Sequence, residues 1–185
     1  MKIAVLFPGI GYTCDKPLMY YAGKLAAQRG YKVIPVAYRG FPDNVKGDPV
    51  KMRRALEIAC EQAGDILADV DMNACDDVLF IGKSIGTLVA ARYARQRDFP
   101  ARSILFTPLA ETFCFTRGEA IAFHGTADPW ADTDAIIGAC REQDIPLCLT
   151  EGANHSLETG NVETDLKTLV ETLERVGQFI NGVRP

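Results

Sequence analysis

A serine between two glycines, in the segment Gly82-Lys83-Ser84-Ile85-Gly86, is the strongest chemical signal in this sequence. The segment follows the apolar run Val78–Ile81 and precedes a helical pattern that begins at Thr87. A sharp strand-to-helix turn of this kind, a nucleophile elbow, exposes the serine hydroxyl and needs glycines where strand and helix approach closely. We therefore predict that Ser84 attacks a carbonyl carbon.

A serine hydroxyl is a weak nucleophile at neutral pH and needs a base within hydrogen-bond reach. The chain has two histidines, His124 and His155. His124 ends an apolar, strand-like run, which is typical of a buried structural histidine, whereas His155 lies in the polar loop 152–157. His155 is the preferred base and His124 is the alternative.

A carboxylate is also expected, because it holds the imidazole in the required tautomer and stabilises its cation. Asp128 is the preferred residue for this role. Asp132 or Thr133 would cap the helix that follows, Asp134 would lie in its first turn, and Glu111 follows the fourth predicted strand. The three acidic residues Asp132, Asp134 and Glu111 remain alternatives for this role.

The residues Gly82-Lys83-Ser84 also match the last three positions of a phosphate-binding loop. That loop needs a further glycine at position 77, where the chain has Asp77 within a predicted strand. Without the backbone N–H groups of the loop, a nucleotide has no cradle. We therefore interpret Lys83 as a solvated side chain beside the site, with contact to an anionic substrate as the alternative.

Short apolar runs alternate with helical patterns along the chain. The sequence predicts strands at 2–7, 32–37, 77–81, 103–106, 120–123 and 147–150, and helices at 17–29, 49–70, 87–97, 134–142 and 162–180. This alternation indicates a parallel sheet with helices on both faces. Ligands bind such sheets at the carboxyl ends of the strands, which is where the loops with Ser84, Asp128 and His155 fall.

The order Ser, Asp, His and the motifs P-G-I-G (8–11), G-K-S-I-G (82–86), H-G-T-A-D-P (124–129) and G-A-N-H-S-L (152–157) resemble the α/β-hydrolase superfamily over nearly the whole chain. The chain starts at what would be the third strand of larger members and has no long lid insertion. It is thus similar to the small lidless members, such as dienelactone hydrolases and esterases. The resemblance implies a three-layer, doubly wound sandwich with a mostly parallel six-stranded sheet in the order 2-1-3-4-5-6, forming one domain over 1–185.

The resemblance also assigns roles. It implies a Ser84–His155–Asp128 triad, and it places the oxyanion donors on the backbone of Ile85 and Ile10, with Gly11 or Tyr12 as alternatives to Ile10. Five residues beside these are expected to meet the substrate: Gly9, Gly11, Tyr12, Lys83 and Trp130. Trp130, Tyr12, Phe41 and Phe113 fit either an acyl pocket or the ordinary core.

Composition excludes some classes of partner. A net charge of −4 and a pI near 5.2, with no cluster of basic residues, offer no surface for nucleic acid or anionic lipid. The six cysteines lack metal-ligand spacing, so neither a metal nor another cofactor is expected, and free thiols with no membrane segment predict a cytoplasmic protein. Self-association is left open.

We therefore predict a serine hydrolase that cleaves a carboxylic ester or thioester of a small acyl substrate through an acyl-enzyme. Two alternatives remain. One is a binding or scaffold protein on a hydrolase fold. The other is a different reaction of the same triad, namely hydrolysis of a peptide or a carbon–carbon bond.

Overall fold

The computed structural model describes residues 1–183, and its centre is a six-stranded sheet in the order β2-β1-β3-β4-β5-β6. Every neighbouring pair of strands is parallel. The strands are β1 (Lys2–Phe7), β2 (Tyr31–Pro35), β3 (Asp77–Lys83), β4 (Arg102–Phe106), β5 (Ala120–Gly125) and β6 (Leu147–Thr150). The strand order predicted from the sequence is confirmed, and the sheet is wholly rather than mostly parallel.

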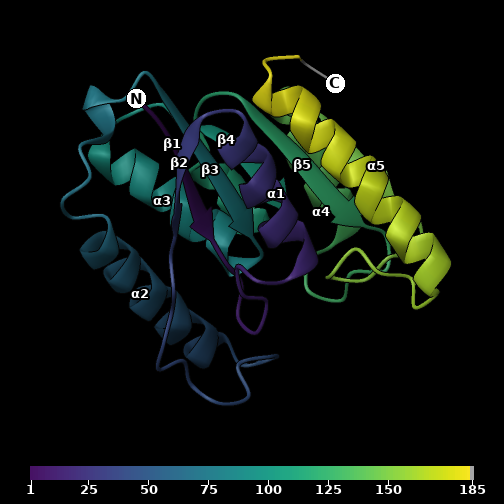
Figure 1. Cartoon of the computed structure of the whole chain (residues 1–185). Coiled ribbons are helices and arrows are strands. Elements are labelled where there is room, and N and C mark those ends of the chain that lie inside the picture. Colours follow the sequence, from purple (N-terminus) through teal and green to yellow (C-terminus); the bar gives the residue numbers. More distant parts are fainter. Residues whose placement is uncertain (184–185) are drawn as a thin grey trace.

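Helices cover both faces of the sheet, which gives three layers (Figure 1). The helices are α1 (Pro17–Gln28), α2 (Pro49–Ile66), α3 (Ile85–Arg97), α4 (Thr133–Glu142) and α5 (Val162–Ile180), with short 3₁₀ helices at Met72–Ala74 and Ala110–Cys114. The yellow α5 lies beside α1 on one face, while α2 and α3 pack together on the other (Figure 1).

The alternation of side chains along each strand produces these two cores. On β3, Leu79 and Ile81 pack under α1 and α5, whereas Val78 and Phe80 pack against the side of α2 and α3. The central strands therefore carry apolar side chains on both faces over most of their length, as a sheet buried on both faces requires. Helix α4 adds Ile136 to a third cluster, below β4 and β5.

Several boundaries differ from those that the sequence predicts. Helix α2 ends at Ile66 rather than at position 70, and β2 covers 31–35 rather than 32–37. The stretch after β4, where no helix is predicted, contains the 3₁₀ helix Ala110–Cys114. No helix within residues 1–183 has the length and apolar character needed to cross a bilayer.

All six strands end at the same edge of the sheet, because they are parallel. The loops after β1, β3, β5 and β6 therefore meet at the lower edge in Figure 1. These loops contain Ser84, Asp128 and His155, the three residues that the sequence predicts to act in catalysis.

Candidate active site

Ser84 occupies the single residue between the end of β3 and the start of α3, with φ 55° and ψ −125°. This backbone region is strained for a residue with a side chain, and it persists only where the surroundings hold it. Both neighbouring glycines are required by packing. A Cβ on Gly82 would lie 2.7 Å from Thr87 Cα, and one on Gly86 would lie 2.0 Å from the carbonyl oxygen of Phe7. The turn thus has the sharp strand-to-helix geometry that the glycine spacing predicts.

A continuous hydrogen-bonded chain runs from the Ser84 hydroxyl to a buried carboxylate. Ser84 Oγ lies 2.7 Å from His155 Nε2, and His155 Nδ1 lies 2.6 Å from Asp128 Oδ2. An ionised carboxylate only accepts hydrogen bonds, so Nδ1 carries the proton and Nε2 is left as an acceptor for the Ser84 hydroxyl. The three residues come from the loops after β3, β5 and β6, which are far apart in the sequence.

Asp128 is held from two sides. Its Oδ1 accepts a hydrogen bond from the Trp130 amide at 2.9 Å, while its other oxygen faces His155. Burial alone raises the pKa of this carboxyl, but the hydrogen bonds from His155 and from the Trp130 amide outweigh burial and hold the pKa below its usual value. Asp128 is therefore ionised at neutral pH, as the orienting role requires.

His155 lies in the middle of this chain, between Ser84 and Asp128, and its side chain is 17% exposed. The Trp130 ring stacks on the imidazole, with ring centroids 5.5 Å apart and planes 25° apart. Burial lowers the pKa of His155 below 6.5; the hydrogen bond with Asp128 opposes this effect, and the charges of Lys83 and Lys46 add to it. The imidazole is thus neutral near pH 7, the form that can accept a proton.

The alternative residues have other partners. His124 is buried, and its Nε2 lies 3.1 Å from Thr133 Oγ1, in agreement with the structural role predicted for it. Its Nδ1 lies 3.8 Å from Asp128 Oδ2, whereas His155 Nδ1 lies 2.6 Å from the same oxygen. Asp132 caps α4, because its Oδ1 accepts from the Ala135 amide at 2.8 Å.

The other two acidic alternatives are likewise accounted for by position. Asp134 lies in the first turn of α4, where a negative charge is favoured by the helix dipole. Glu111 is exposed in the 3₁₀ helix after β4. The carboxylate that contacts His155 is that of Asp128.

Two backbone segments border Ser84. Ile85 is the first residue of α3, and the first N–H groups of a helix have no acceptor within the helix. The loop after β1 passes very close to the elbow, since a Cβ on Gly9 would lie 3.2 Å from Ser84 Cβ. Ile10 packs beside Ile85, and Gly11 has φ +73°. These positions place the backbone of both loops next to the serine.

Lys83 is not where the sequence analysis put it. We expected a solvated side chain, but Lys83 is 1% exposed, so that prediction is wrong. The physical reason is the alternation of β3: Leu79, Ile81 and Lys83 share one face of the strand, and that face is covered by α1 and α5. Its Nζ donates to Thr107 Oγ1 at 2.6 Å.

The aromatic residues divide between site and core. The hydroxyl of Tyr12 accepts from the Leu18 amide at 3.2 Å, and burial raises the pKa of Tyr12 to about 12. Phe113 belongs to the core below β4 and β5, and Phe41 packs beside Ile85. Trp130 is the aromatic residue in contact with His155.

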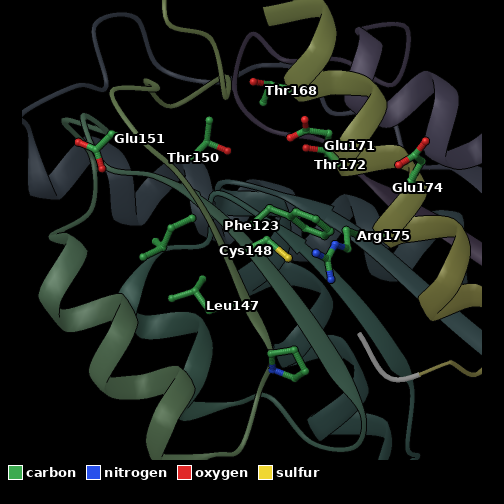
Figure 2. A pocket seen from close by; sticks show the side chains of 12 residues that line it. Phe123, Leu147, Cys148, Thr150, Glu151, Thr168, Glu171, Thr172, Glu174 and Arg175 are labelled. Atoms are coloured by element: carbon green, nitrogen blue, oxygen red, sulfur yellow. The ribbon is translucent and has the colours of Figure 1, made fainter. Parts of the chain in front are cut away.

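A separate cavity of about 560 Å³ lies between the edge strand β6 and α5. Figure 2 shows the side chains that line it. Arg175 reaches from α5 toward Cys148 and Phe123, while Glu171 and Glu174 line the wall along the helix (Figure 2). Its walls include none of Ser84, Asp128 and His155. The cavity is therefore separate from the hydrogen-bonded chain.

No family model matches the sequence, and a comparison with curated proteins finds no match either. Solved structures do match. An α/β serine hydrolase homologue from Coxiella burnetii is 17% identical, with a TM-score of 0.67 over 97% of this chain and 84% of that one. A lidless α/β serine hydrolase from Xanthomonas campestris is 16% identical, with a TM-score of 0.62 over 96% and 79%.

An esterase from Pyrococcus furiosus is 15% identical, with a TM-score of 0.70 over 98% of this chain and 83% of that one. At such identities the comparison establishes the fold. The chain therefore has the α/β-hydrolase fold, in a small form similar to the lidless structures, as the sequence motifs predict.

Proposed function

We propose that the protein is a serine hydrolase that cleaves a carboxylic ester or thioester of a small acyl substrate through an acyl-enzyme. The observation that carries this proposal is the chain from Ser84 Oγ through His155 to Asp128, with contacts of 2.7 and 2.6 Å. Such a chain, on a strained turn that exposes the serine, is the arrangement that activates a hydroxyl for attack.

In the first half of the reaction, Ser84 Oγ bonds to the carbonyl carbon while His155 Nε2 takes the hydroxyl proton. The carbonyl oxygen becomes an oxyanion, and the backbone N–H groups of Ile85 and Ile10 are the proposed donors to it. Asp128 stabilises the imidazolium that forms. The intermediate then expels the alcohol or thiol, which receives the proton from His155, and leaves the acyl group on Ser84.

In the second half, water attacks the acyl carbon and gives a proton to His155 as it does so. Collapse of this intermediate returns a proton to Ser84 Oγ and releases the carboxylic acid. The stacking of Trp130 on the imidazole supports this cycle, because it restrains the ring in the orientation that both proton transfers share.

The loop after β1 supports the proposed oxyanion site. Gly9 lies against Ser84, and Gly11 adopts φ +73°, a backbone conformation that favours glycine. Both glycines, together with Tyr12 and Trp130, are the proposed neighbours of the substrate. Lys83 is left out of this set because its buried side chain has no free surface with which to meet a substrate.

The test is turnover of p-nitrophenyl acetate, p-nitrophenyl butyrate and a matched acyl thioester by the wild-type protein and by Ser84→Ala. We expect measurable hydrolysis by the wild type and a loss of kcat of about 10⁶-fold in the variant, the scale seen when a triad serine is removed. Wild-type activity that survives in Ser84→Ala would overturn the assignment. If the protein hydrolyses none of these substrates although a fluorophosphonate labels Ser84, hydrolysis of a peptide or a carbon–carbon bond is favoured instead.

A further inference from the structure

Lys83 is a buried basic residue that the proposed reaction leaves without a role. Lysine is almost never fully buried unless it is paired, because removing an ammonium group from water is costly. Within residues 1–183 the side chain of Lys83 forms no ion pair, and it directly precedes the nucleophile. The free-energy cost of burying an ammonium group directly beside Ser84 indicates that Lys83 has a function there.

The side chain of Lys83 contacts the loops that surround the triad. Its stem lies against the loop after β1, since a Cβ on Gly9 would be 3.6 Å from Lys83 Cγ, and its Nζ lies 5.0 Å from the centre of the Tyr12 ring. Its Nζ also donates to Thr107 Oγ1, at the end of β4, at 2.6 Å. Lys83 therefore contacts both the loop after β1 and Thr107, the residue that follows β4.

Thr107 extends this connection to the base. Its hydroxyl donates to the backbone carbonyl oxygen of His155 at 3.1 Å, and a hydroxyl has only one proton, so it must accept the hydrogen bond from Lys83. Thr107 has φ 40°, a strained conformation fixed by the hydrogen bond from its amide to the Phe123 carbonyl at 2.7 Å. Hydrogen bonds therefore lead from Lys83 through Thr107 to the backbone of His155.

Lys83 and His155 also influence each other electrostatically. Asp128 and Glu158 are the acidic groups that favour the ammonium form of Lys83, while burial lowers the pKa of Lys83 to about 7. Tyr12 faces the ammonium with its ring and is neutral at this pH. Lys83 in turn lowers the pKa of His155, as does the exposed Lys46. The buried amine and the imidazole thus disfavour each other's protonation.

We propose that Lys83 is a positioning residue: through its hydrogen bond to Thr107 it fixes the backbone of His155, and its buried charge acts on the His155 imidazole. The proposal rests on the proposed function for its catalytic consequence. Its structural content, namely the link from Lys83 to His155, can be measured without turnover.

The first experiment titrates the two histidines by NMR with ¹³Cε1 labelling, using His124→Asn to assign the signals. Lys83→Met removes the buried cation, and Lys46→Met is the matched control that removes an exposed cation near His155. We expect the pKa of His155 to rise in Lys83→Met, and to rise by more than in Lys46→Met. An unchanged pKa, or a rise no larger than in the control, would overturn the proposal.

The second experiment breaks the link but keeps the lysine. Thr107→Val is isosteric and lacks the hydroxyl, whereas Thr107→Ser retains it. On p-nitrophenyl acetate we expect Thr107→Val to lower kcat about tenfold, the rate equivalent of one hydrogen bond, with KM changed less than about twofold. Thr107→Ser should keep kcat within about threefold of the wild type, since it restores the same hydrogen bond.

Equal losses in the two Thr107 variants, or no loss in Thr107→Val, would contradict the proposal. These variants also decide it if Lys83→Met does not fold. A wild-type protein without any hydrolytic activity would refute the proposed function, and the NMR titration would still decide whether Lys83 acts on His155.

Discussion

Replacing Lys83 by Met should make the protein more stable at low pH and not at high pH. Methionine has nearly the same length and no charge, so the variant avoids burying an ammonium group. The pKa of Lys83 falls from 10.5 to about 7 in the folded protein, with burial as the main cause. The values differ by about 3.5, which corresponds to about 5 kcal/mol of destabilisation while the lysine is charged in both states.

The direction of this pH dependence follows from the numbers of protons that the folded and unfolded states bind. Below pH 7 both the folded and the unfolded wild type carry the proton, so the full cost is present. Between pH 7 and pH 10.5 the unfolded state binds more protons than the folded state, and the stability of the wild type therefore rises with pH. The methionine variant lacks this contribution. It also lacks the hydrogen bond to Thr107, a loss of about 1 kcal/mol.

Urea unfolding at pH 6, 8 and 10 measures the difference. At pH 6 we expect Lys83→Met to be more stable than the wild type by about 4 kcal/mol. The advantage should shrink steadily with rising pH and vanish above pH 10. Lys32→Met, at an exposed position of β2, is the control and should follow the wild-type curve. Parallel stability curves for Lys83→Met and the wild type would refute the reasoning.

Three further predictions concern the site and its scaffold. Asp128→Asn should keep the fold and lower kcat on p-nitrophenyl acetate by about 10⁴-fold, as loss of the orienting carboxylate does in serine proteases; a kcat within about tenfold of the wild type would argue against its role. Gly86→Ala should destabilise the protein by more than about 3 kcal/mol, because its Cβ would lie 2.0 Å from the Phe7 carbonyl oxygen; circular dichroism melting measures this, and an unchanged Tm would contradict it. The acid limb of kcat/KM should lie below pH 6.5, because burial lowers the pKa of the base, His155, and activity needs its neutral form; a limb above that value would contradict the assignment.

The elbow was predictable because its glycines have a steric reason that the sequence displays. Gly82 and Gly86 stand where strand and helix approach, and no side chain fits at either position. The sheet order was inferred from the resemblance to the α/β-hydrolases, and the alternation of strands and helices alone gave only the layers. Strand ends and helix ends shifted by a few residues, because hydrogen bonding at element termini depends on neighbouring loops.

The burial of Lys83 was missed, although a signal was present. Leu79, Ile81 and Lys83 stand at every second position, and the strand continues through Lys83, so the lysine side chain faces the same core as the other two. The predicted strand ends at Ile81, two residues before the observed end of β3, and therefore leaves Lys83 in the turn. Thr107 carried no such signal, because its contact with His155 joins residues 48 positions apart.

Covalent labelling of Ser84 tests the central claim most directly. A fluorophosphonate reacts only with an activated hydroxyl, and trypsin cleavage after Lys83 and Arg92 yields the peptide 84–92, which mass spectrometry can sequence. We predict an adduct on Ser84 in the wild type, little adduct in His155→Ala, and none on this peptide in Ser84→Ala. The absence of any adduct from the folded wild type over a broad set of probes would contradict the account.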